Sequence, residues 1–120
     1  MRIFKNTWFT RFAEKEGITD SELRELVNQL EAGQADANLG GGVYKVRVAR
    51  PGEGKAGGYR VIVFFKSEER TFYEYCFAKS DRANISNKLL KVYKEVAKEY
   101  LSMPPDQLRE RIGQGKLVEL

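Results

Sequence analysis

Residues 43–79 read VYKVRVARPGEGKAGGYRVIVFFKSEERTFYEYCFAK, and this stretch decides the fold. It contains three runs that are rich in β-branched and aromatic residues, each bounded by glycine or by charged turn residues. A glycine-rich loop at 51–58 and a polar turn at 67–70 separate the runs. Consecutive runs of this kind predict three strands that pair in order as an antiparallel meander.

The cations in this stretch follow the alternation of strand side chains between two faces. Lys45 and Arg47 share one face of the first strand, while valines and a tyrosine occupy the other. Arg60 opens the second strand, and Lys79 closes the third, which also carries Tyr73 on the face that we expect to be cationic. A surface of lysine, arginine and tyrosine backed by an apolar one indicates a site for a phosphodiester, and we expect RNA.

The net charge of +4 is concentrated in the same region. Residues 43–82 contain nine lysines or arginines against five acids, whereas the rest of the chain has equal numbers of both signs. This distribution is typical of a phosphate-binding surface. The alternative is a strand edge that lysines protect from aggregation.

The N-terminal part predicts a short strand at 2–4 and two helices. Asn6 can cap a first helix from 7 to about 16, which Gly17 ends. Thr19 and Glu22 have the spacing of a capping box, and apolar residues at helical intervals follow until Gly33. The two helices form an α-hairpin, followed by a small, flexible segment at 34–42.

The C-terminal part predicts a third helix that begins near Ser86, a break at Pro104-Pro105, a short helix at 106–112 and an edge strand at 116–120. The expected fold class is α+β. Residues 1–120 form one domain, in which the N-terminal α-hairpin packs on a small antiparallel sheet and a C-terminal helix and tail follow. We expect residues 102–120 to be an extension of the shared core.

Composition excludes several kinds of chemistry. The chain has no histidine and one cysteine, which rules out Ser-His-Asp hydrolysis, a ribonuclease with paired histidines and most zinc sites. No acidic cluster indicates paired magnesium ions, so we expect neither metal nor cofactor. Cys76 is expected to be a small buried hydrophobic residue. The longest apolar run, 61–65, is too short to span a bilayer, and we expect a cytoplasmic protein without a signal peptide.

One reaction suits the remaining residue types. RNA supplies its own nucleophile, the 2′-hydroxyl, so a protein need only align it, neutralise the pentavalent phosphate and move two protons. Fixed cations stabilise the charge that develops on the phosphate. A tyrosine among cations can have its pKa drawn below the usual value of roughly 10 and can then serve as the base.

The chain resembles the RelE/HigB superfamily of toxins from type II toxin–antitoxin modules. The resemblance covers about residues 1–101 and is carried by four motifs, which are YKVRV at 44–48, GGYRVI at 57–62, the aromatic third strand and AKSDR at 78–82. The basic glycine loop is closest to the HigB-like branch. The resemblance implies a ribosome-dependent endoribonuclease, or mRNA interferase, that enters the ribosomal A site and cleaves mRNA by 2′-hydroxyl attack without metal.

The resemblance also implies roles for individual residues. By position, Lys45 and Arg47 hold and neutralise the scissile phosphate, and Arg60 stabilises the transition state. Lys79 and Arg82 flank the same pocket. The residues expected to bind RNA are Arg47, Arg50, Lys55 and Arg82. The chain has Ser80 and Ser86 where well-studied RelE enzymes have a basic general acid and a general-base tyrosine. We therefore predict Tyr73 as the base, assisted by Lys55 or Lys79.

Two other functions remain open. A toxin of the ParE type shares the fold and inhibits DNA gyrase by protein binding, which the two serines favour. A plain RNA-binding module needs exposed strand aromatics for base stacking, and an inward-facing Tyr75 and Phe77 would argue against it. The expected partners are a cognate antitoxin of the helix-turn-helix type that covers the basic face, the ribosome and mRNA, with no membrane.

Overall fold

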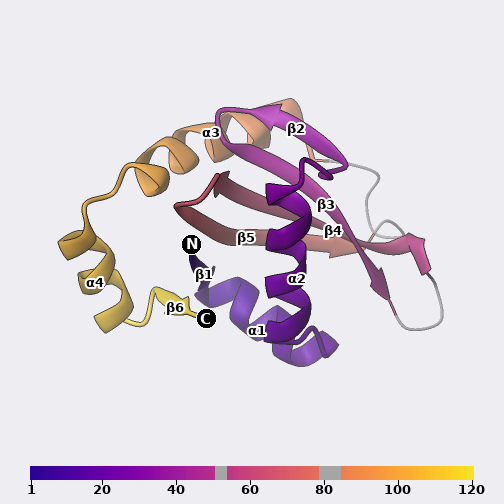
Figure 1. Ribbon diagram of the computed structural model, residues 1–120, viewed down its shortest axis with the longest axis horizontal. Coiled ribbons are helices and arrows are strands. Elements are labelled where there is room, and N and C mark those ends of the chain that lie inside the picture. Colours follow the sequence, from indigo (N-terminus) through magenta and orange to yellow (C-terminus); the bar gives the residue numbers. More distant parts are fainter. Residues whose placement is uncertain (51–53, 79–84) are drawn as a thin grey trace.

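The computed structural model describes residues 1–50, 54–78 and 85–120, including the side chains of all of these except 50 and 54–57. Ten elements follow one another in these ranges (Figure 1). They are β1 (Arg2–Asn6), α1 (Thr7–Glu16), α2 (Asp20–Glu31), β2 (Ala37–Gly40), β3 (Val43–Arg50), β4 (Gly54–Lys66), β5 (Arg70–Ala78), α3 (Asn87–Leu101), α4 (Pro105–Gly113) and β6 (Leu117–Glu119).

The strands form one six-stranded sheet in the order β2-β3-β4-β5-β1-β6. The predicted meander of β3, β4 and β5 is confirmed, because each pairs with the next in antiparallel orientation. The α+β class is confirmed too. The sheet is larger than the predicted one and is mixed, since β1 runs parallel to β5 and antiparallel to β6.

Local capping explains the two N-terminal helices. The Asn6 side chain accepts a hydrogen bond from the Phe9 N–H at 2.7 Å, and Gly17 ends α1 in the left-handed conformation. Thr19 and Glu22 form the predicted capping box at the start of α2. Because these signals lie within a few residues of each helix end, the sequence predicted both helices well.

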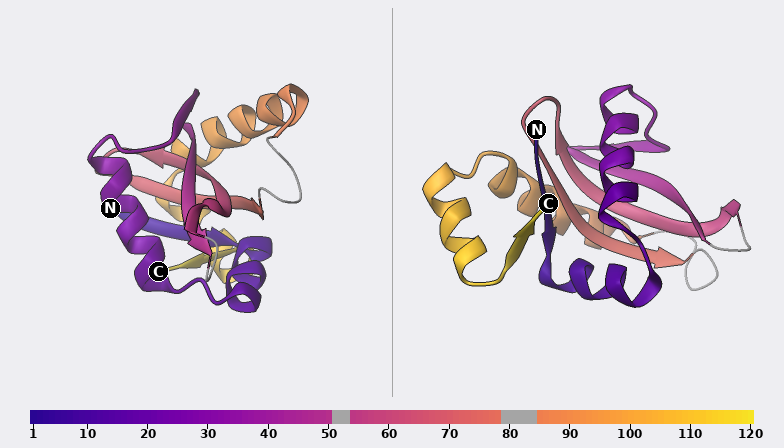
Figure 2. Two further views of the ribbon diagram at one scale, coloured as in Figure 1. Left: turned by 90° about the vertical axis from the view of Figure 1, so that its right-hand side faces the viewer. Right: turned by 60° about the horizontal axis from the view of Figure 1, so that its bottom comes forward.

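Helices cover both faces of the sheet, as the left-hand view of Figure 2 shows for α2 and α3. On the face covered by α1 and α2, here called the hairpin face, buried residues of both helices pack on β3, β4 and β5. On the face covered by α3 and α4, here called the α3 face, a second core forms around Phe64 and Phe72. The sheet therefore has no fully open face in the described part of the chain.

A tight glycine turn corrects the prediction for residues 34–42. Gly40, Gly41 and Gly42 have φ values of 89°, 62° and 84°, which other residues rarely adopt. They reverse the chain so that β2 pairs with the start of β3. The segment predicted to be a flexible connection thus contains an edge strand.

The C-terminal residues are part of the packed structure. Met103, Leu108 and Leu117 are buried in the core of the α3 face. The predicted edge strand is confirmed as β6, which lies beside β1 and is fastened by a two-fold hydrogen-bonded ion pair between Arg2 and Glu119 at 2.8 and 3.0 Å. The description of this region as a tail is wrong, because β6 is paired with β1 in the sheet and Leu108 of α4 packs on apolar residues of the sheet.

Candidate functional site

Three of the predicted site cations lie together on the α3 face. Lys45 and Arg47 alternate along β3 with Tyr44, Val46 and Val48, which pack on the hairpin face. Arg60 lies on β4, directly opposite Arg47. We call Lys45, Arg47 and Arg60 the cationic row. The prediction that Lys45 and Arg47 share one face of their strand is confirmed.

Arg47 and Arg60 are two like-charged residues directly opposed on neighbouring strands. The Arg47 N–H donates outward to the Asp36 carboxylate at 2.5 Å and therefore does not bond to β4. Opposed residues without mutual hydrogen bonds have Cα atoms only about 4.5 Å apart, closer than in the alternate pairs. Like charges that face each other across strands are destabilising. The Asp36 carboxylate beside Arg47 offsets part of this repulsion, and an anion bound between the two arginines would offset more of it.

The three cations differ in environment. The Arg47 guanidinium lies 3.5 Å from an Asp36 oxygen, and its side chain remains 49% exposed. Arg60 is only 5% exposed, whereas Lys45 is half-buried. An arginine that is held in a buried place is already oriented and desolvated, which strengthens its interaction with an anion that reaches it.

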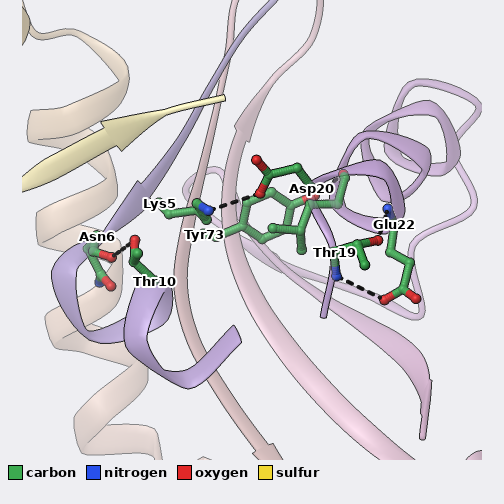
Figure 3. A network of polar contacts seen from close by, with 8 residues as sticks. Lys5, Asn6, Thr10, Thr19, Asp20, Glu22 and Tyr73 are labelled. Carbon is green, nitrogen blue, oxygen red and sulfur yellow. Dashed lines mark hydrogen bonds and ion pairs between the residues drawn. The ribbon is translucent and has the colours of Figure 1, made fainter. Parts of the chain in front are cut away.

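Tyr73 does not belong to this site, and the prediction that it serves as the base is wrong. Its ring lies in the core of the hairpin face, next to the Lys5–Asp20 ion pair (Figure 3). The side chain is fully buried, its hydroxyl donates to the Leu23 carbonyl, and burial raises the pKa of the phenol well above its usual range.

A β-bulge explains why Tyr73 lies on the opposite face. Ile62 pairs with Tyr75 but the next residue, Val63, pairs with Tyr73, so Glu74 is an extra residue in β5. The bulge interrupts the alternation, and Tyr75 contacts the core of the α3 face while Tyr73 packs on the other. Simple alternation would have placed both tyrosines on one face.

The strand aromatics are packed inward to different degrees. Phe77, opposite Arg60, is buried, and Tyr75 is half-buried, with ring centroids 6.1 Å apart. A plain RNA-binding sheet would expose both rings for stacking. The burial of Phe77 therefore counts against that alternative.

The family of the chain follows from one comparison. The family model described as the RelE toxin of the RelE / RelB toxin–antitoxin system matches residues 1–120. The chain belongs to the RelE toxin family. This confirms the resemblance to RelE toxins and extends it beyond residue 101, in agreement with the packing of α4 and β6 on the sheet.

Other predicted residues of this RelE chain lie outside the described residues. These are Lys79, Ser80 and Arg82, together with the side chains of Arg50 and Lys55. Ser86 is described, and its hydroxyl accepts a hydrogen bond from the Leu89 N–H at 3.1 Å as the cap of α3. Ser86 therefore has a structural role at the start of α3.

Sequence reasoning missed two acids, one beside the RelE candidate site and one in the neighbouring strand β5. Asp36 binds both the backbone and the guanidinium of Arg47, and Glu74 forms the bulge. Burial raises the pKa of Glu74, against the opposing effect of a hydrogen bond from Asn6. No sequence signal identifies either residue, because both act through pairing between strands.

The expectations for Cys76 and for metals can be compared with the described residues. Cys76 is buried as predicted, and burial raises the pKa of its thiol to about 12, so it is a poor nucleophile. Within residues 1–50, 54–78 and 85–120, no group of histidine, cysteine or acidic residues could hold a metal ion. None of the helices in those ranges is both long and apolar enough to cross a membrane.

Proposed function

We propose that this RelE-family toxin is a ribosome-dependent mRNA endoribonuclease of the HigB-like branch that cleaves by metal-independent 2′-hydroxyl attack and inhibits translation. The observation that carries the proposal is the opposed pair Arg47 and Arg60, with Lys45 on the same face. Membership of the RelE family supports the same class of activity.

The reaction needs charge neutralisation more than any other contribution. The 2′-oxygen attacks the adjacent phosphorus while the 5′-oxygen leaves, and negative charge accumulates on the non-bridging oxygens of the pentavalent phosphate. In the proposed site, Lys45 and Arg47 hold this phosphate, and Arg60 stabilises the charge that develops. Removal of one such donor costs other enzymes about 10²- to 10³-fold in rate.

Proton transfer must come from groups other than Tyr73. The 2′-hydroxyl loses a proton and the 5′-oxygen gains one, so a base and an acid are needed on the α3 face. With Tyr73 excluded, we propose that Lys55 or Lys79, predicted above to assist the base, transfers a proton itself, and Arg50 and Arg82 remain proposed RNA contacts. Lys45 is the described candidate for the same role, because no ion pair engages it within the described part of the chain.

A toxin of this family acts together with an antitoxin. We propose that a small helix-turn-helix antitoxin neutralises this chain by covering the cationic row, which would exclude the phosphate. The ribosome and its bound mRNA are the proposed targets.

Cleavage of a defined mRNA on purified ribosomes tests the proposal. The variants are Lys45→Ala, Arg47→Ala and Arg60→Ala, and the matched control is Arg109→Ala, which removes an exposed arginine on α4. We expect the three site variants to lose about 10²- to 10³-fold in rate and the control to cleave normally. Because Arg60 is buried, Arg60→Lys and thermal unfolding of every variant distinguish lost chemistry from lost folding.

Two results would contradict the proposal. Cleavage by Arg47→Ala and Arg60→Ala at the wild-type rate would show that the two arginines of the cationic row do not contribute to the reaction. If the wild-type protein arrests growth but cuts no mRNA, with or without ribosomes, the proposed endoribonuclease activity is refuted. DNA gyrase is then the next target to assay.

A further inference from the structure

A chain of aromatic contacts leads from α1 to the candidate site. Trp8 stacks on Phe12 with ring centroids 5.1 Å apart, and its other contact is Tyr75 of β5 at 4.6 Å. Tyr75 in turn contacts Phe77 at 6.1 Å. We call these four residues the aromatic row.

The row crosses an edge of the sheet. β1 pairs with β5 only as far as Tyr73 and then ends at Asn6. Beyond this point helix α1, instead of a paired strand, lies beside the second half of β5 (Figures 1 and 2). Trp8, in the first turn of α1, therefore reaches Tyr75 around the strand edge.

Trp8 is unusual in its exposure. It is 42% exposed, although it is the largest side chain in the chain and has two aromatic neighbours that are more buried. Exposed tryptophan surface forgoes the free energy of apolar burial. Such surface beside a charged site is the kind that binding of an amphipathic ligand would cover.

The aromatic row ends at the cationic row. Phe77 lies directly opposite Arg60, and Tyr75 lies opposite Ile62, which in turn lies opposite Lys45. The cations of β3 and β4 thus lie beside the rings of β5 on one face of the sheet. Single-stranded nucleic acid has the complementary pattern, because its phosphates need cations and its bases need flat apolar surfaces.

We propose that Trp8, supported by Tyr75, is the platform on which a base of the mRNA next to the scissile phosphate stacks. The proposal rests on the function proposed above and adds to it a residue that positions the substrate. The cations contact every nucleotide alike, so a stacked base at Trp8 would set the register and orientation in which the mRNA enters the site.

A double-mutant cycle on the ribosome tests the platform. Wild type and Trp8→Leu are each given a synthetic mRNA and the same mRNA with an abasic nucleotide at one position on either side of the cut. We expect Trp8→Leu to cleave the intact mRNA about 5- to 150-fold more slowly than wild type, the loss typical of one stacked base. At one of the two positions the abasic mRNA should slow wild type similarly and Trp8→Leu hardly at all.

Three control variants separate stacking from folding. Trp8→Phe keeps an aromatic ring and should restore most of the rate. Val118→Ala removes another exposed apolar side chain, on β6, and should change nothing. Thermal unfolding of Trp8→Leu measures what the loss of packing on Phe12 costs, and only the abasic comparison reports on the base itself.

The outcomes distinguish the platform from the enzyme. The platform is refuted if wild type cleaves and Trp8→Leu cleaves equally fast. It is also refuted if base removal slows both proteins by the same factor at every position. In either case the proposed endoribonuclease activity is unaffected. If Trp8→Leu cleaves normally but escapes its antitoxin, the exposed ring is a protein contact and the platform is again refuted. If wild type cuts nothing, both proposals fail together.

Discussion

The hydroxyl of Tyr73 donates a hydrogen bond to the backbone carbonyl of Leu23, and both side chains are fully buried. This bond joins β5 to α2 in the middle of the hairpin-face core. Because water cannot replace a lost partner there, the bond matters to stability even though Tyr73 takes no part in the proposed reaction.

Tyr73→Phe should destabilise the protein and leave cleavage intact. Loss of the hydroxyl leaves a buried carbonyl with one fewer partner, so the free energy of unfolding should fall by about 1 kcal/mol. Urea unfolding measures the loss, and the ribosome assay measures the rate. A folded variant that no longer cleaves would restore Tyr73 as a candidate base.

Asp20→Ala should show that the Lys5–Asp20 pair fastens α2 to β1. The two charged atoms are 2.9 Å apart, and the Lys5 side chain is only 10% exposed, so Asp20→Ala leaves a nearly buried ammonium without its partner. We expect a loss of about 1–2 kcal/mol in the free energy of unfolding. Asp106→Ala, which removes an exposed acid from the first turn of α4, should lose about 0.3–1 kcal/mol through the helix dipole alone. Equal losses in the two variants would show that the ion pair contributes nothing.

Gly42→Ala should be the most destabilising glycine substitution of those compared. A Cβ at Gly42 would lie 2.4 Å from Leu101 Cδ1, and its φ of 84° already disfavours alanine. Gly115→Ala has a similar φ of 74° and open space around it, so it measures the backbone cost alone. We expect Gly42→Ala to unfold at a temperature several degrees below that of Gly115→Ala. Adding Leu101→Ala to Gly42→Ala should remove the clash and recover part of the difference. Identical melting temperatures would mean that Leu101 does not constrain this turn.

Glu74→Gln should stabilise the protein at neutral pH. Burial raises the pKa of Glu74 above 4.5, so the folded state holds the proton more tightly than the unfolded state. The free energy of unfolding must then fall as the pH rises from the ordinary pKa through the raised one. Glutamine is neutral and keeps an oxygen for the Asn6 side chain, so the variant should lack this fall.

Thermal unfolding of Glu74→Gln and wild type between about pH 4 and pH 7 measures this difference. The advantage of the variant should grow with pH, and Glu14→Gln, on the exposed side of α1, serves as the control. An advantage that shrinks as the pH rises would contradict the assignment.

The sequence predicted the elements whose signals are local. Asn6 and Thr19 cap their helices within three residues, and the alternation in β3 placed Lys45 and Arg47 correctly. The face of Tyr73 could not be predicted, because it depends on a bulge that is defined only by pairing with β4. The same holds for β2, which exists because a glycine turn brings it back to β3.

The site was predicted in part for the same reason. Alternation identifies which cations share a face, but the sequence does not show how deeply Arg60 is buried or that Asp36 engages Arg47. Trp8 was not among the predicted site residues. Its contact with Tyr75 depends on where β1 stops, which is a property of the whole sheet.

The position of β1 also has a consequence for synthesis of the toxin. This strand is made before the other strands of the sheet, yet its two neighbours are β5 and β6. Both of its edges therefore stay unpaired until residues at least 64 positions further along the chain have been made. Pairings between such distant segments form slowly, because a long loop must close before any contact is gained. While a ribosome is still producing residues 117–119, the sheet is incomplete. The order of synthesis thus delays the complete sheet until β6 has been made.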